Sequence, residues 1–315
     1  ACSDGKEGAL MRKAFYLKQT KSGRAFDIFN GIALFVLLFI TIYPFWNMLV
    51  LSFNDGTDAL LGNLYFWPRE WTLANYEYVF KNSKLLHGAL VSVLRVLVGT
   101  ATGVGCNALL GYICSNKNFY GRKFMRMLFL ITMYFGGGLI PTYLLMVQLG
   151  FVNSFAVYIV PGLFSAYYML LASSYMESIP SALFESARID GASETRTFAS
   201  IALPLAKPML ACIAVYIGVG HWNSYFNAMV YLNDSDKYPL QVFLREILTL
   251  GNFMSEVTDS ASYSAEEIAY FTKQAETANM MKYAIIVAST APMLILYPFL
   301  EKYFAKGVMI GSVKG

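Results

Sequence analysis

The residues of this 315-residue chain that could do chemistry are few, and they suit binding better than catalysis. One run mixes aromatic rings with amides, and its members are Trp222, Asn223, Tyr225 and Asn227. Aromatic rings stack on the C–H faces of sugars, and amides form hydrogen bonds with sugar hydroxyls. The run therefore predicts part of a path for a sugar, or else an aromatic group that packs helices or lies at a membrane interface.

Two further features lie inside apolar stretches. Arg95 is placed where a charge costs about 2.5–3.5 kcal/mol on insertion scales, so its side chain must face protein or a water-filled cavity. It either contacts a polar or acidic solute or pairs with a neighbouring helix. Gly137, in the run Gly136–Gly138 ahead of Pro141, predicts a helix break that lines a pathway or allows close helix packing.

Catalytic patterns are absent from the sequence. There is no Walker A motif, no constellation of the Ser-His-Asp, His-Glu-x-x-His or paired-carboxylate kind, and no metal-ligand spacing among the cysteines. We therefore expect no catalytic residue, no metal and no cofactor on this chain. The chain is not expected to be an enzyme or to bind ATP through a P-loop.

The most polar internal segment, residues 178–208, predicts a helix–turn–helix. Pro180 suits the start of a first helix, and Gly191 can supply the left-handed residue that ends it. Ser193 is placed to cap a second helix, with Glu194 in its first turn, and Pro204 ends the unit. Two short helices exposed to water on a membrane protein predict a docking surface for a soluble partner.

This segment resembles the EAA loop of binding-protein-dependent ABC importer permeases. The family pattern E-(A/S)-A-x-x-x-G is followed after nine residues by I-x-L-P. Ser186 stands at the middle alanine and keeps a small side chain there, and Asp190 is similar to the carbohydrate branch. The matching positions, predicted to couple to the ATPase, are Glu185, Ser186, Ala187, Asp190, Gly191, Ile201, Leu203 and Pro204.

The resemblance implies the permease subunit of an ATP-driven importer for oligosaccharides, close to the maltose-type and complex-oligosaccharide branch. Its solutes would include acidic or plant-polysaccharide fragments. The implied partners are a second homologous permease, two ATPase subunits that bind ATP and Mg, and an extracytoplasmic solute-binding protein. Glu185 would meet polar groups of the ATPase, Gly191 would permit the turn, and the 222–225 run resembles a W-N-x-(Y/W) signature of maltose-type permeases.

Composition predicts an all-α integral membrane protein. The chain is 57% hydrophobic and 14% charged, with a mean hydropathy of +0.48. A membrane span needs roughly 20 apolar residues, and six stretches qualify. We place them near residues 28–53, 85–115, 127 onward, 155–176, 209–232 and 278–300. The EAA loop then lies between spans four and five.

The distribution of Lys and Arg predicts the orientation. Segments 1–27, 116–126, 178–208 and 301–315 hold 16 of them, whereas 54–84 and 233–277 hold 6. The positive-inside rule places both termini and the docking loop in the cytoplasm. The resemblance implies a multi-pass protein of the bacterial inner (cytoplasmic) membrane. The predicted parts are a cytoplasmic segment 1–27, a transmembrane domain 28–300, a long extracytoplasmic loop 233–277 with a short helix, and a cytoplasmic tail 301–315. Residues 1–10 are not used to predict the fold.

Three other functions compete with this interpretation. A self-sufficient secondary transporter predicts ion-coupling charges within the spans, where only Arg95 and Lys282 lie. An intramembrane enzyme predicts a reactive cluster, which the sequence lacks. An ABC permease for a non-sugar solute would share the docking loop. Nucleic acid is not an expected partner, because the net charge of +4 is modest and the basic residues are confined to loops.

Overall fold

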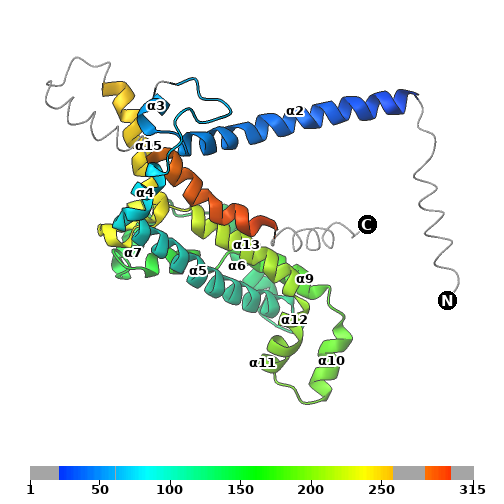
Figure 1. Cartoon of the computed structure of the whole chain (residues 1–315). Helices are drawn as coiled ribbons and strands as arrows, with labels where there is room; N and C mark the ends of the chain where they lie inside the picture. The colour runs from blue at the N-terminus through cyan, green and yellow to red at the C-terminus, as the bar shows by residue number, and fades with distance from the viewer. Residues whose placement is uncertain (1–20, 61, 258–280, 299–315) are drawn as a thin grey trace.

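The computed structural model describes residues 21–60, 62–257 and 281–298, and within these ranges regular structure is helical. The predicted tail 301–315 and residues 1–10 lie outside the described residues. The elements, shown in Figure 1, are α2 (Lys21–Ser52), α3 (Gly56–Leu60), α4 (Ala74–Lys81), α5 (Ser83–Ser115), α6 (Arg122–Tyr134), α7 (Leu139–Gln148), α8 (Ala156–Ile159), η1 (Val160–Gly162), α9 (Ala166–Glu177), α10 (Ser181–Ile189), α11 (Glu194–Thr197), η2 (Phe198–Ala202), α12 (Leu203–Leu205), α13 (Lys207–Asn223), α14 (Phe226–Tyr231), η3 (Ser235–Lys237), α15 (Leu240–Val257) and the helix Met281–Pro298.

Helix α5 is the centre of the body. It packs against α13 and α9, and near its start against α15. Small residues let these helices approach closely: a Cβ placed on Gly99 would lie 2.3 Å from His221 Nε2, and one on Gly111 would lie 2.6 Å from the Cβ of Ala172. Helices in lipid have no hydrophobic driving force to associate, so the van der Waals contact that this close approach allows must hold them together.

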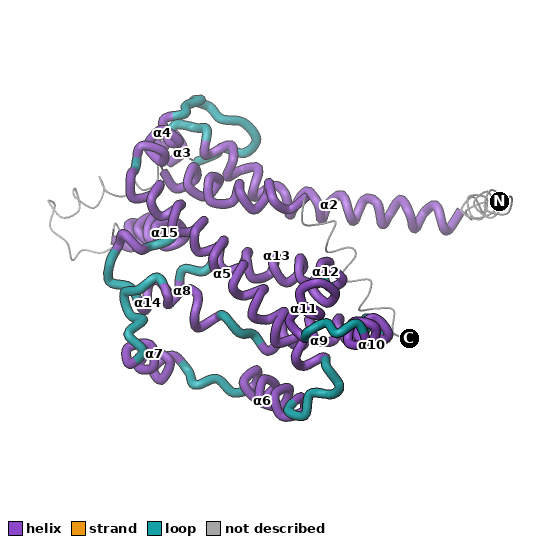
Figure 2. Tube along the Cα trace, turned by 90° about the horizontal axis from the view of Figure 1, so that it is seen from below, coloured by secondary structure: helices purple, strands orange, loops and turns teal. Residues whose placement is uncertain are grey.

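The described helices include three that are long and apolar enough to cross a membrane: Gly23–Ser52, Ser83–Ser115 and Met281–Pro298. Three bent pairs raise the number to as many as six if each pair is one span. One pair joins α6 to α7 at 119°, along one edge of the molecule in Figure 2, and a second joins α8–η1 to α9 at 53°. The break predicted at Gly136–Gly138 is present, because α6 ends at Tyr134 and α7 begins at Leu139.

Two expectations need correction. The span predicted as 209–232 is not one helix: α13 ends at Asn223, Ser224 is extended, and α14 starts at Phe226. Asn and Ser favour such ends because their side chains compete for backbone hydrogen bonds. The loop 233–277 holds an 18-residue helix, α15, where a short one was expected. Its residues Leu240 and Ile247 are buried against α5 and the helix 281–298, at the spacing of a helix face.

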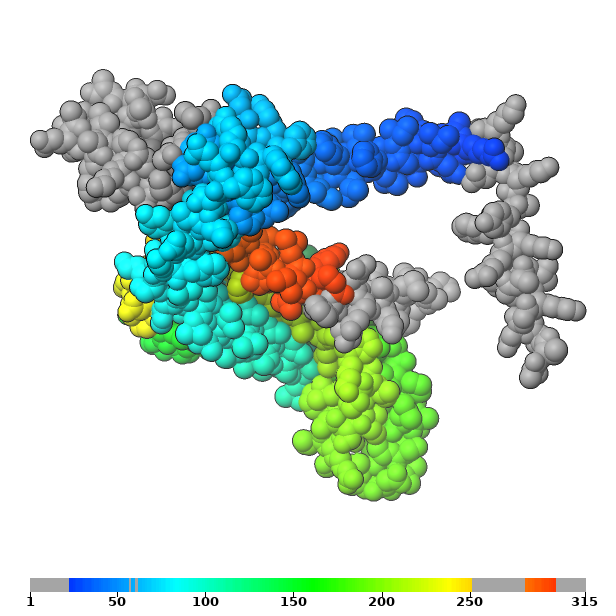
Figure 3. Space-filling model, viewed as in Figure 1, coloured from blue at the N-terminus to red at the C-terminus, as the bar shows by residue number. Residues whose placement is uncertain are grey.

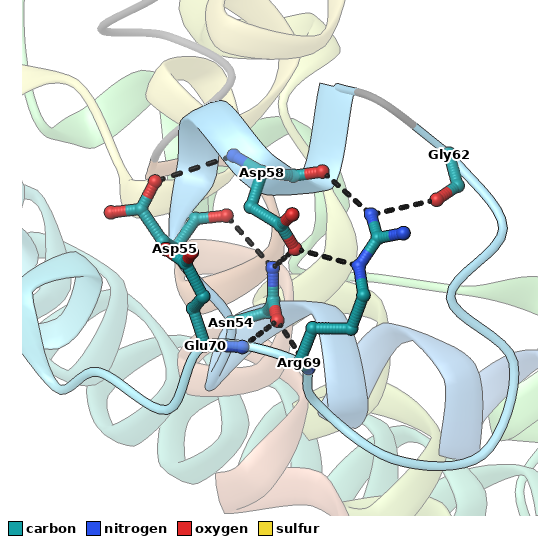
Figure 4. A network of polar contacts seen from close by, with 6 residues as sticks. All are labelled: Asn54, Asp55, Asp58, Gly62, Arg69 and Glu70. Carbon is teal, nitrogen blue, oxygen red and sulfur yellow. Dashed lines mark hydrogen bonds and ion pairs between the residues drawn. The ribbon is translucent and has the colours of Figure 1, made fainter.

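The loop that follows α2 is closed by hydrogen bonds of Asn54 (Figure 4). The buried Asn54 amide donates to Asp58 Oδ2 at 2.8 Å, and its Oδ1 accepts from the backbone N–H groups of Arg69 at 2.8 Å and Glu70 at 3.0 Å. Arg69 Nε in turn donates to Asp58 Oδ2 at 3.1 Å. Because one side chain serves both ends of the 54–70 loop, the loop closes without regular strands.

The packing of α5 gives a first testable prediction. Replacing Gly111 by Ala puts a Cβ 2.6 Å from Ala172 Cβ and 3.0 Å from Ser173 N, so the helices must separate. We expect a loss of about 1–3 kcal/mol, measured as a lower unfolding temperature in mild detergent. Gly105 is the matched control on the same helix, because its Cβ would meet nothing within 4 Å. Equal unfolding temperatures for the two variants would contradict this packing.

Candidate functional site

The candidate docking unit is the segment 181–205, which we call the hairpin. It extends away from the body as a separate lobe, the yellow-green part of Figure 3. Helix α10 follows Pro180 and ends at Ile189, and Gly191 then adopts a left-handed φ of +76°. Ser193 Oγ accepts from the N–H of Arg196 at 3.3 Å and caps α11. The local folding predicted from these residues is confirmed.

The predicted coupling positions divide into an exposed and a packed set. Glu185, Ser186, Asp190, Gly191 and Pro204 are exposed, as a docking surface requires. The packed set faces into the lobe and the body, and it consists of the buried Ala187 and the half-buried Ile201 and Leu203.

A cavity of about 430 Å³ lies beside the hairpin. Its walls come from the end of α5 and the following loop, the end of α9, and one face of α10. Glu185 and Arg188 line it from α10, and Lys117 and Glu177 line it from the body. Glu185 therefore faces a space bordered by charges of both signs.

The root of the hairpin is held by an aromatic cluster and an ion-pair group. Tyr112 of α5 packs against Phe198 at 5.2 Å and against Phe184 at 6.4 Å between ring centroids. Glu177, the last residue of α9, accepts from both Arg122 and Arg126 at the start of α6. The sequence interpretation missed these residues. The available signal was an arginine pair four residues apart, one helical turn, with a glutamate at the end of the predicted span ahead of the docking loop.

The predicted pathway residues gather only in part. Arg95 is 1% exposed, donates from Nη1 to the carbonyl of Ser224 at 2.7 Å, and lies 4.3 Å above the ring of Tyr158. Its guanidinium thus satisfies the carbonyl exposed by the break between α13 and α14. In this chain the group joins helices, which is one of the two roles left open above.

The amide–aromatic run surrounds the same break. Trp222 is buried and donates from Nε1 to the carbonyl of Ser289 at 3.0 Å, so its indole packs against the helix 281–298. Asn223 is exposed, Asn227 is half-buried, and the ring of Tyr225 lies 4.5 Å below Arg245. Gly137 lies on a different break, between α6 and α7, and is also exposed. Asn223 is therefore better placed than Trp222 to meet a solute.

A helical body with broken membrane-crossing helices and an exposed helical hairpin defines an integral membrane transport subunit. The chain belongs to the family described as binding-protein-dependent transport system inner membrane component, whose model matches residues 107–310. The hairpin, the α6–α7 break and the α13–α14 break fall inside that match.

Relatives match over almost the whole chain. Protein LplC of Bacillus subtilis is 35% identical over 305 residues, which cover 97% of this chain and 100% of that protein. The polygalacturonan/rhamnogalacturonan transport system permease protein YtcP of the same organism is 34% identical, covering 93% and 99%. A chain in the crystal structure of a bacterial ABC transporter involved in the import of the acidic polysaccharide alginate has a TM-score of 0.80 at 27% identity, covering 90% and 98%.

Arg95 supplies the second prediction. We expect Arg95→Met to lower the unfolding temperature strongly, because the Ser224 carbonyl loses a charged donor worth about 1.5–3 kcal/mol. Arg245→Met is the control, since Arg245 also lies over a tyrosine ring but is exposed. If Arg95→Met unfolded at the normal temperature and lost uptake of acidic solutes alone, the residue would instead act by contacting solute.

Proposed function

We propose that this chain is the translocation-pathway subunit of an ATP-driven ABC importer for oligosaccharides, with six membrane spans and the hairpin as its coupling element. The observation that carries the proposal is the exposed hairpin with Gly191 at a left-handed φ, borne on a body of this permease family. A secondary transporter has no need for such a lobe. The alternative of a secondary transporter is therefore set aside.

The orientation follows from charge. The α5–α6 turn and the hairpin lie at the same end of the body, and both carry the basic residues that the positive-inside rule assigns to the cytoplasm. Both chain ends would then be cytoplasmic, and α4 and α15 would face the exterior. ATPase subunits, which need cytosolic ATP, would meet the hairpin.

The proposed assembly contains a second homologous permease, two ATPases and an extracytoplasmic solute-binding protein. Helix α2 supports the second permease, because its most apolar window has none of its residues buried within the chain and the helix projects from the body. The exterior end, formed by α4, α15 and the 54–70 loop, is the part that a solute-binding protein could reach.

The proposed solute is an oligosaccharide, with acidic fragments as the first candidates. The name of one relative gives polygalacturonan and rhamnogalacturonan, and the solved transporter is described as involved in the import of the acidic polysaccharide alginate. Asn223, Asn227 and Tyr225 around the α13–α14 break are groups of the kind that bind sugars. An ABC permease for a non-sugar solute remains the competing function.

The docking role is tested by Glu185→Ala. Loss of an exposed carboxylate at the proposed interface should leave the fold intact and reduce the ATPase subunits that co-purify in mild detergent by at least several-fold. Glu77→Ala is the matched control, because Glu77 is an exposed helical glutamate at the opposite end of the body. Unchanged ATPase recovery and unchanged ATP-driven uptake for Glu185→Ala would refute the docking assignment.

The solute class is tested on the reconstituted complex with its binding protein. Oligogalacturonates and alginate oligosaccharides should raise the rate of ATP hydrolysis several-fold, and neutral maltodextrins should raise it much less. The rate without sugar is the baseline for each complex. Stimulation by maltodextrins alone would contradict the acidic class, and stimulation by no sugar would favour the non-sugar alternative.

A further inference from the structure

One carboxylate joins three helices at the base of the hairpin. Glu194, in the first turn of α11, accepts at Oε2 from the hydroxyl of Tyr112 on α5, at 2.7 Å. Its other oxygen, Oε1, accepts from Arg188 near the end of α10, at 3.1 Å from Nη2 and 3.3 Å from Nε. The two oxygens therefore tie both helices of the hairpin to a membrane-crossing helix of the body.

The two bonds of Glu194 differ in environment. The Arg188–Glu194 ion pair is exposed on both sides, and exposed pairs contribute little. Tyr112 is 8% exposed and its ring lies against Phe184 and Phe198, so its hydroxyl is held in one place. The hydrogen bond between Tyr112 and Glu194 is therefore the stronger constraint on how the hairpin sits against α5.

Helix α5 runs unbroken from this contact to the predicted pathway. Tyr112 and Arg95 are 17 residues apart on one helix, which is about 26 Å at 1.5 Å per residue. At the far position Arg95 holds the carbonyl of Ser224 between α13 and α14. One helical turn from Arg95, α13 also packs closely on α5, because a Cβ on Gly99 would lie 2.3 Å from His221 Nε2. A displacement of one end of α5 must therefore be carried to the α13–α14 break.

We propose that Tyr112 and Glu194 are positioning residues that lock the hairpin to α5, so that movement imposed on the hairpin by the ATPases reaches the α13–α14 break along this helix. The inference rests on the proposed function and adds to it the physical connection inside this chain. Hydrophobic packing alone would permit the hairpin to pivot about the aromatic cluster. The hydrogen bond opposes that pivot, because turning the hairpin separates Glu194 from a hydroxyl fixed on α5.

The test measures whether movement of the hairpin reaches the α13–α14 break, and it does not require the solute to be known. Met229 on α14 is 51% exposed next to the break, so Met229→Cys in a background lacking Cys2 and Cys106 reports movement there through its rate of labelling by a maleimide. The rate is measured on the assembled complex, with and without ATP and vanadate. Tyr112→Phe removes one hydroxyl and keeps the ring. Tyr175→Phe is the matched control, because the Tyr175 side chain packs in the same cluster and its hydroxyl makes no hydrogen bond within the described residues.

We expect ATP and vanadate to change the labelling rate in the parent complex, and Tyr112→Phe to reduce that change at least three-fold while ATPase recovery stays normal. Tyr175→Phe should behave like the parent. Glu194→Ala should match Tyr112→Phe, and the double variant should be no worse than either. Glu194→Gln should retain most of the response, since the amide oxygen can still accept from Tyr112.

The inference is overturned if Tyr112→Phe and Glu194→Ala leave the labelling change intact, or if the parent complex shows no change with ATP and vanadate. It is also overturned if Glu194→Gln is as damaging as Glu194→Ala, because the charge pair with Arg188 would then be the essential contact. Failure of the proposed function gives a different result: no ATPase subunits co-purify with any of these proteins, including the parent.

Discussion

The structure depends on how closely helices can approach α5. Without water to drive association inside a bilayer, packing must come from contact, and contact needs small side chains. Gly99 and Gly111 provide two such places: one admits His221 of α13, and the other admits Ala172 of α9. The helix that receives these neighbours also carries Arg95 near its middle and Tyr112 near its end. Both ends of the proposed mechanism are therefore built on the best-packed element of the body.

Polar groups have a consistent role in this arrangement. At two of the helix breaks a side chain of α5 satisfies the freed backbone, and Arg95 does so for Ser224. The buried Asn107 does the same on α5, donating to the carbonyl of Leu163 at 3.0 Å beside the η1–α9 break. Breaks of this kind are tolerated in membranes only when protein or water completes the hydrogen bonds. The polar residues of α5 thus permit irregular backbone in the neighbouring helices.

The sequence predicted features that rest on local rules. The hairpin, its turn at Gly191 and its cap at Ser193 follow from backbone geometry and capping, which act over a few residues. The break at Gly136–Gly138 follows in the same way. The end of α13 at Asn223 was missed, because apolar residues continue past the local signal of Asn223 and Ser224, and the contact that satisfies the Ser224 carbonyl comes from Arg95, 129 positions away. The length of α15 was missed because its periodicity lies in a stretch interpreted as a loop.

The contact between Tyr112 and Glu194 could not be predicted, because it depends on residues far apart in the sequence and not on a local rule. Glu194 fits the local rule that favours a carboxylate in the first turn of a helix, so its position needs no distant partner. Tyr112 lies near the end of a predicted membrane span, where aromatic residues are common, so its position also indicates no particular partner. Only the folded chain brings them together, across 82 positions in the sequence. A family motif can identify a surface that meets a partner, but the residues that carry the resulting motion into the membrane lie where three-dimensional packing places them.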